Sequence, residues 1–124
     1  MELPFWRDRL LARFGIELLT PGAPERSVVH RVIYEELCLG RIEEASRVAY
    51  SRIIDQLRDA GAEAVILGCT EIGLLVGEAD SSLPIFDTAV LHAAAAVDFS
   101  LRAHQQDGAE DAAADSLALD ATSG

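Results

Sequence analysis

The chain has little cysteine, no long apolar run and few basic residues, and each shortage argues against a class of protein. Only two cysteines occur among 124 residues, so a disulfide-stapled secreted scaffold is not expected. No uninterrupted apolar stretch is long enough for a transmembrane helix. The opening MELPFWRDRLLARFG carries three arginines and an aspartate, which a secretory signal would not tolerate. We therefore expect a soluble, cytoplasmic protein without a membrane partner.

The charge balance argues against a nucleic-acid partner. Ten basic residues face 21 acidic ones, for a net charge of −11, whereas a protein that binds DNA or RNA presents a basic patch. Part of the acidity is local, because residues 107–124 carry acidic residues and no basic or aromatic one. Such a composition cannot bury enough surface to offset the entropy of ordering. We expect one α/β domain over residues 1–106 and a disordered acidic tail over 107–124.

Apolar periodicity predicts helices that alternate with short strands. Apolar residues three or four apart predict helices over 4–14, 25–39 and 42–60, and a fourth from Asp87 or Thr88 to about 103. Short apolar runs predict strands over 16–20, 64–68 and 83–86. The continuous apolar run 64–68 is typical of a strand buried on both faces of a parallel sheet. The alternation indicates an α/β fold with a doubly wound parallel sheet.

One of the two cysteines, Cys69, directly follows the predicted strand 64–68. Ligands of open parallel sheets bind beyond the carboxyl ends of the strands. A helix that began near Glu71 would favour an anion there and would lower the pKa of the thiol. The alternative is plain: a free cysteine is usually a small core residue, and a threonine followed by an acid suits the first turn of a helix.

The neighbours of Cys69 suit the binding of an amino acid. Gly68 would let a ligand approach the backbone closely. Thr70 can donate its hydroxyl to a carboxylate, and Glu71 can hold an ammonium group or steer a proton. Asp87 and His92 are expected near the same rim. Here too an alternative stays open, because Asp87 suits a helix cap and a single histidine is more often structural than catalytic.

Three segments carry a resemblance to a known family: IYEELCLG at 33–40, GCTEIGLL at 68–75 and PIFDTAVLHA at 84–93. Over residues 1–101 the chain resembles the C-terminal half of the aspartate/glutamate racemase family. Glutamate racemases usually carry histidine after the Cys-Thr pair, so Glu71 makes the sequence similar to the aspartate racemase side. The resemblance implies one half of a two-domain, pseudo-symmetric fold that forms homodimers in full-length members.

The resemblance also implies a chemistry. Family members racemise amino acids without a cofactor or metal, using two cysteines on opposite faces of the substrate α-carbon. By resemblance, Cys69 is the second catalytic cysteine. The substrate is a small amino acid, and the binding candidates are Gly68, Thr70, Glu71 and His92.

A second catalytic cysteine is not apparent in the sequence. In the family it belongs to a Cys-Asn-Thr motif of the first half, and no such motif occurs here. Cys38 lies between two leucines near a predicted helix end and is interpreted as core. We therefore expect a truncated chain that lacks an interior strand, so that 16–20 and 64–68 flank a gap. Two alternatives remain: a non-catalytic remnant or interaction module, and a related cysteine isomerase such as a hydantoin racemase.

Overall fold

The computed structural model describes residues 4–102 and divides into two units, Met1–Thr88 and Ala89–Gly124. Each unit is described by itself. The predicted acidic tail, 107–124, lies outside the described residues, as does the predicted end of the fourth helix at 103.

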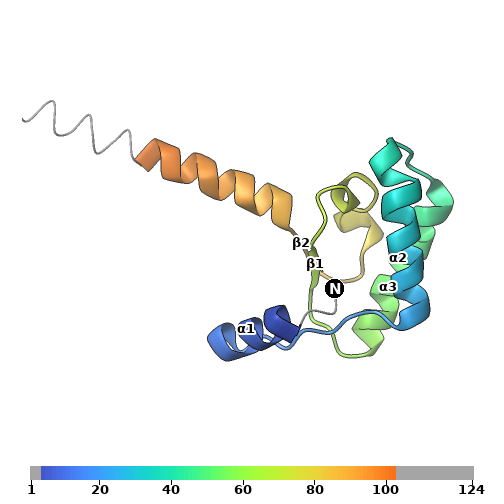
Figure 1. Cartoon of the computed structure of the whole chain (residues 1–124), viewed down its shortest axis with the longest axis horizontal. Helices are drawn as coiled ribbons and strands as arrows, with labels where there is room; N and C mark the ends of the chain where they lie inside the picture. The colour runs from blue at the N-terminus through green and yellow to red at the C-terminus, as the bar shows by residue number, and fades with distance from the viewer. Residues whose placement is uncertain (1–3, 103–124) are drawn as a thin grey trace, which may run out of the picture. The chain divides into compact units, whose positions relative to one another are not determined.

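Within residues 4–88, the first unit contains three α-helices, two strands and three single 3-10 turns; Figure 1 labels the helices and strands. The elements are α1 (Pro4–Phe14), α2 (Ala23–Glu35), η1 (Leu37–Leu39), α3 (Glu44–Asp59), β1 (Val65–Leu67), η2 (Ile72–Leu74), η3 (Glu78–Asp80) and β2 (Ile85–Asp87). The three helices predicted within this unit are confirmed, with α2 ending four residues early. It ends there because the chain turns through η1 to Gly40, whose φ of 71° is the left-handed conformation that glycine adopts without strain.

The strands β1 and β2 run parallel. Val65 pairs with Ile85, Ile66 with Phe86 and Leu67 with Asp87. The two strands are joined by η2 and η3 rather than by a long helix. Helices and parallel strands in one layered unit confirm the α/β class.

The predicted strand over 16–20 is wrong. Residues 15–22 form neither a helix nor a strand, although the segment 16–20 is mainly apolar. A strand exists only where a neighbour accepts and donates its backbone hydrogen bonds. Among residues 4–102 the sheet consists of β1 and β2 alone, and neither pairs with this segment.

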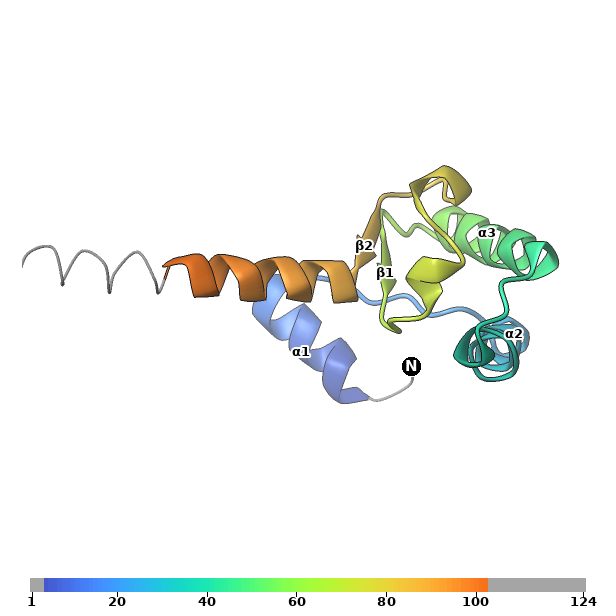
Figure 2. The same ribbon diagram turned by 90° about the horizontal axis from the view of Figure 1, so that it is seen from above.

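The core lies between helices α2 and α3 on one side and β1 with η2 on the other (Figure 2). Its buried members are Val29, Val32, Leu37, Tyr50, Ile53, Leu67, Ile72, Leu75 and Val76. The opposite face of the sheet is different, because Ile66 and Phe86 are each 48% exposed. The prediction that strand 64–68 is buried on both faces is therefore wrong for Ile66.

Arg47 ties the segment after β1 to helix α3. Its guanidinium pairs with Asp80 at 3.2 Å and also donates to the carbonyl of Leu75. Asp80 in turn accepts a hydrogen bond from the backbone N–H of Gly77 at 2.9 Å. These contacts hold η2 and η3 against the helix and so fix the connection between the two strands.

In the second unit the chain is helical as far as residue 102, as predicted. Three apolar residues of this helix, Val90, Val97 and Leu101, are exposed. Within residues 4–102, no helix combines the length and the apolar character needed to cross a bilayer.

The contrast between two neighbouring leucines tests this core. Leu75 is completely buried and Leu74 is 62% exposed. We expect Leu75→Ala to lower the free energy of unfolding by about 2–5 kcal/mol, because the substitution leaves a cavity. Leu74→Ala is the matched control and should cost less than about 0.5 kcal/mol. Urea unfolding followed by circular dichroism measures both, and equal effects would contradict the position of the core.

Candidate functional site

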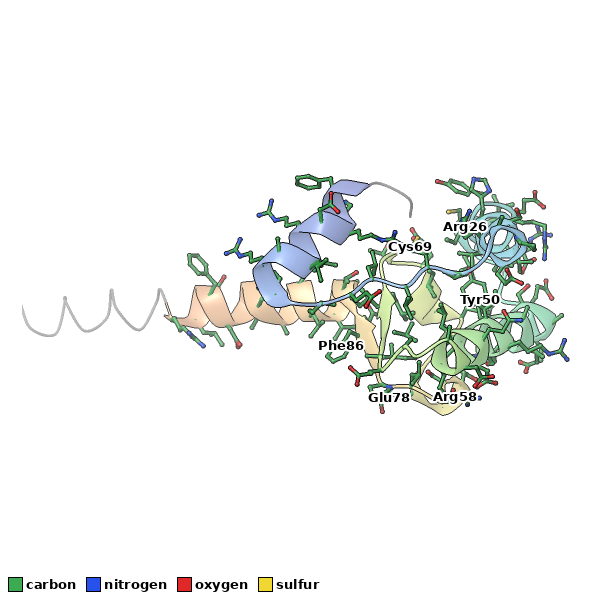
Figure 3. All side chains as sticks on the ribbon, turned by 90° about the horizontal axis from the view of Figure 1, so that it is seen from below. Arg26, Tyr50, Arg58, Cys69, Glu78 and Phe86 are labelled. Carbon is green, nitrogen blue, oxygen red and sulfur yellow. The ribbon has the colours of Figure 1, made fainter. Side chains whose placement is uncertain are left out.

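The candidate site lies where both parallel strands end. Cys69 follows the last residue of β1 by two positions and is half-buried, packed against the core. The Thr88 hydroxyl donates to the Leu67 carbonyl at 2.8 Å, so the carboxyl ends of both strands are held together. Gly68, between strand and cysteine, is exposed. The structure thus places Cys69 at the edge of the sheet where ligands of parallel sheets bind (Figure 3).

The structure brings three of the predicted site residues together. The thiol of Cys69 donates to Oε2 of Glu71 at 2.8 Å. The hydroxyl of Thr70 donates to the same oxygen at 2.9 Å. One carboxylate oxygen therefore orients both side chains. In this arrangement the Thr70 proton points to Glu71, so a substrate carboxylate would have to displace that hydrogen bond.

The protonation states of this group differ from the sequence-based prediction. Burial, followed by the hydrogen bond to Glu71, raises the pKa of the Cys69 thiol. The hydrogen bonds from Cys69 and Thr70 lower the pKa of the Glu71 carboxyl. The expected lowering of the thiol pKa is wrong, because the residues after Glu71 form a single 3-10 turn and not a helix with a dipole. The resting pair is a thiol and a carboxylate.

Sequence reasoning missed a polar cluster on the core side of Cys69. Tyr50 is buried and donates to the Val29 carbonyl at 3.2 Å. Burial raises the pKa of Tyr50 to about 12, with further contributions from the charges of Cys69 and Glu36. The phenol therefore remains neutral near pH 7, and Cys69 packs against the core cluster to which Tyr50 belongs. The burial of Tyr50 could have been predicted from the sequence, because Tyr50 lies about one helical turn from Ile53 on the same face of α3.

The buried carboxylate of Glu36 belongs to the same cluster. It accepts hydrogen bonds from Ser46 at 2.5 Å and from Arg31 at 2.9 Å. These bonds satisfy the charge within the protein and join the end of α2 to α3. Glu36 thus acts as a structural group within this unit.

Cys38 is exposed, so its interpretation as a core residue is wrong. The 3-10 turn η1 buries Leu37 and turns the next two residues outward. The charge of an ionised Cys38 contributes weakly to the raised pKa of Cys69.

Asp87 supports the turn that follows the site. A Cβ atom built on Gly73 would lie 2.2 Å from Oδ2 of Asp87, so the carboxylate packs directly against the η2 backbone. A side chain at position 73 would force this carboxylate to move. Asp87 is thereby placed beneath the turn that follows Glu71, whereas the sequence had offered it as a rim residue or a cap.

His92 lies in the helix of the second unit, where it is exposed. Its role as a substrate-binding residue stays a prediction, as do the binding roles of Gly68, Thr70 and Glu71. Within residues 4–102, no group of three or more His, Cys, Asp or Glu side chains is arranged to hold a metal ion.

The raised pKa of Cys69 has a measurable consequence. We expect Glu71→Gln to shift the pH midpoint of Cys69 alkylation downward, because the neutral amide no longer opposes the thiolate. The shift should be partial, since burial, the larger cause, is retained. Iodoacetamide labelling across pH, read by mass spectrometry of the Cys69 peptide, gives the midpoint. Glu78→Gln, a change in η3, is the control; an unchanged midpoint in Glu71→Gln would contradict the hydrogen-bonded pair.

The contact between Gly73 and Asp87 can be tested by a double-mutant cycle. Gly73→Ala should destabilise the unit by about 1–3 kcal/mol, because the new methyl group displaces the carboxylate. In an Asp87→Ala background the same change should cost less, since the Asp87 side chain is all that the methyl group meets within 4 Å. Gly77→Ala, with open space around it, is the control. Additive effects would disprove the contact.

Comparison with known proteins gives two concordant results. The sequence profile of the family described as Asp/Glu/Hydantoin racemase matches residues 3–96. A crystal structure of a Yersinia pestis protein assigned to the Asp/Glu racemases is similar over 81% of this chain, with 52% identity and a TM-score of 0.74. The match covers 44% of that protein, so the chain spans less than half the length of this relative. The chain belongs to the Asp/Glu/hydantoin racemase family.

Proposed function

We propose that this chain supplies one acid–base cysteine, Cys69, to an amino-acid racemase that needs no cofactor. The observation that carries the proposal is the hydrogen bond from Cys69 to Glu71 at the carboxyl end of the parallel strands. It gives a reactive group a fixed direction in the place where α/β sheets bind ligands. Family membership supports the reaction class.

The raised pKa suits Cys69 to proton exchange with a carbon acid. In one direction the Cys69 S–H bond breaks and a new C–H bond forms at the substrate α-carbon, which leaves a thiolate. In the reverse direction that thiolate takes the α-proton. A high thiol pKa makes the thiolate a stronger base, which favours abstraction of a weakly acidic proton. Glu71 opposes the thiolate state, and so it favours return of the proton to sulfur.

The carboxylate of Glu71 also offers a binding partner for the substrate. Its second oxygen, Oε1, is outside the two hydrogen bonds to Cys69 and Thr70. An α-ammonium group would interact favourably with this carboxylate. We therefore propose a free amino acid as the substrate, held through its ammonium group beside the thiol.

Racemisation requires a second acid–base group on the opposite face of the α-carbon. Cys69 can exchange a proton on one face of the α-carbon only. The relative is more than twice as long as the segment that this chain matches, and we propose that the second group belongs to polypeptide beyond that segment. The chain by itself should then exchange the α-proton with solvent slowly and should not racemise efficiently.

Deuterium exchange tests this proposal. The purified chain is incubated with L-aspartate or L-glutamate in deuterated buffer at increasing pH, and a 5-substituted hydantoin forms a third arm. Proton NMR follows the α-proton, and chiral chromatography follows the enantiomers. We expect slow exchange that rises with pH and is lost in Cys69→Ala but retained in Cys38→Ala. Exchange that is absent, or that survives in Cys69→Ala, would rule out the proposed role; exchange of the hydantoin alone would reassign the substrate class.

A further inference from the structure

Arg47 of α3 supplies a hydrogen-bond donor to a buried carbonyl that lies behind the candidate site. Its Nη1 atom donates to the carbonyl of Leu75, the residue that ends the η2 turn. Leu75 exposes no surface to water, and a buried carbonyl without a donor is costly. If the Arg47 donor were removed, the end of η2 would have to move until water or another donor reached this carbonyl.

The guanidinium of Arg47 is itself held in direction. Nη1 also lies 3.2 Å from Oδ2 of Asp80, and Nε lies 3.2 Å from Oε2 of Glu44, one turn earlier on α3. Asp80 belongs to η3, which packs beside α3 (Figure 2). The side chain of Arg47 is partly buried among these partners. Arg47 therefore fixes the Leu75 carbonyl relative to a long helix.

Backbone hydrogen bonds carry this constraint back to the thiol. The N–H of Ile72 donates to the carbonyl of Cys69 at 3.2 Å, and the carbonyl of Ile72 accepts from the N–H of Leu75 at 2.9 Å. Glu71 lies within this hydrogen-bonded segment, which begins after β1 and ends at the carbonyl that Arg47 holds. A movement at the end of η2 would therefore change where the Glu71 side chain points.

We propose that Arg47 is a positioning residue of the candidate site: by holding the Leu75 carbonyl it fixes η2, and η2 directs the carboxylate of Glu71 at the thiol of Cys69. The inference deepens the proposed function and rests on it, because it concerns the pair to which proton exchange is assigned there. Arg47 acts through the backbone of η2 and not as a group that touches the substrate.

The charge of Arg47 and its positioning role act on the thiol in opposite directions. Removal of a cation by itself disfavours a nearby thiolate and so raises the pKa of the thiol. Loss of the hydrogen bond from Cys69 to Glu71 lowers the pKa of Cys69, because that bond is one of the causes of its raised value. The sign of the change therefore separates positioning from simple loss of charge.

Other titratable groups act on this region from the neighbouring elements. They are Cys38 on η1, Tyr50 on α3, Glu36 after α2, whose charge acts on Tyr50, and Asp87 on β2, which packs against η2. Tyr50 stays neutral near pH 7, since its pKa is raised to about 12. All four groups are unchanged in the variants compared below, so they form a constant background.

Alkylation of Cys69 across pH tests the inference on the full chain. Arg47→Met keeps the aliphatic bulk of the side chain and removes its donors. We expect it to lower the pH midpoint of iodoacetamide labelling, by at most the shift that Glu71→Gln produces. In the Glu71→Gln background the same change should lower the midpoint no further, because no carboxylate is left to position. Mass spectrometry of the Cys69 peptide gives every midpoint, and amide hydrogen exchange at residues 72–76 should become faster in Arg47→Met.

Two further variants make the test specific. Arg58→Met is the matched control, because Arg58 also lies on α3 and its substitution removes the same charge, but its ion pairs are with Asp55 and Asp59. It should not lower the midpoint. Arg47→Lys keeps the charge and a donor on a side chain that is one atom shorter, so it should lower the midpoint less than Arg47→Met. Circular dichroism checks each fold, and Arg47→Lys replaces Arg47→Met in the comparison with Glu71→Gln if Arg47→Met unfolds.

Three outcomes would overturn the inference. The first is a midpoint that stays or rises in Arg47→Met, which would leave Arg47 a structural residue even if residues 72–76 exchange faster. The second is a lowering that persists in the Glu71→Gln background, which would assign the effect to lost burial of the thiol. The third is an unchanged midpoint in Glu71→Gln alone, since Arg47 would then have no effective carboxylate to position. None of these readouts requires turnover, so the deuterium-exchange experiment decides the proposed function separately.

Discussion

The parallel pairing of β1 with β2 is the constraint on which the rest of the structure depends. It brings Leu67 beside Asp87, although the two residues are twenty positions apart in the sequence. Once the strands are paired, Thr88 can donate to Leu67 and Asp87 can pack under Gly73. Both contacts act on the segment that begins at Cys69. The position of the thiol is therefore a product of strand pairing rather than of the local sequence around it.

The length of the turn after Glu71 decides the state of the thiol. A full helix there would have offered unpaired N–H groups and a dipole, which stabilise a thiolate. The chain forms one 3-10 turn instead, because Leu75 and Val76 turn into the core directly after it. With the dipole absent, burial and the adjacent carboxylate are the main effects, and both raise the pKa of Cys69. Core packing thus sets the chemistry of the cysteine.

The sequence predicts those features that depend on a single segment. Apolar periodicity locates α2 and α3, and the short apolar runs locate β1 and β2. The run at 16–20 has the same local pattern, but a strand needs a hydrogen-bonded neighbour, and within residues 4–102 neither β1 nor β2 pairs with this run. The prediction that Cys38 is a core residue is wrong for a related reason, because a 3-10 turn replaces the expected helical turn. The residues of the candidate site could be predicted, whereas the shared acceptor of Cys69 and Thr70 depends on side-chain conformations that no local pattern encodes.

The hydrogen-bonded pair of Cys69 and Glu71 is only partly buried. Glu71 influences Cys69 through a carboxylate that solvent partly screens, and electrostatic interactions weaken where water has access. Exclusion of water by a bound substrate would increase the repulsion between the Glu71 carboxylate and the Cys69 thiolate, and with it the strength of the thiolate as a base.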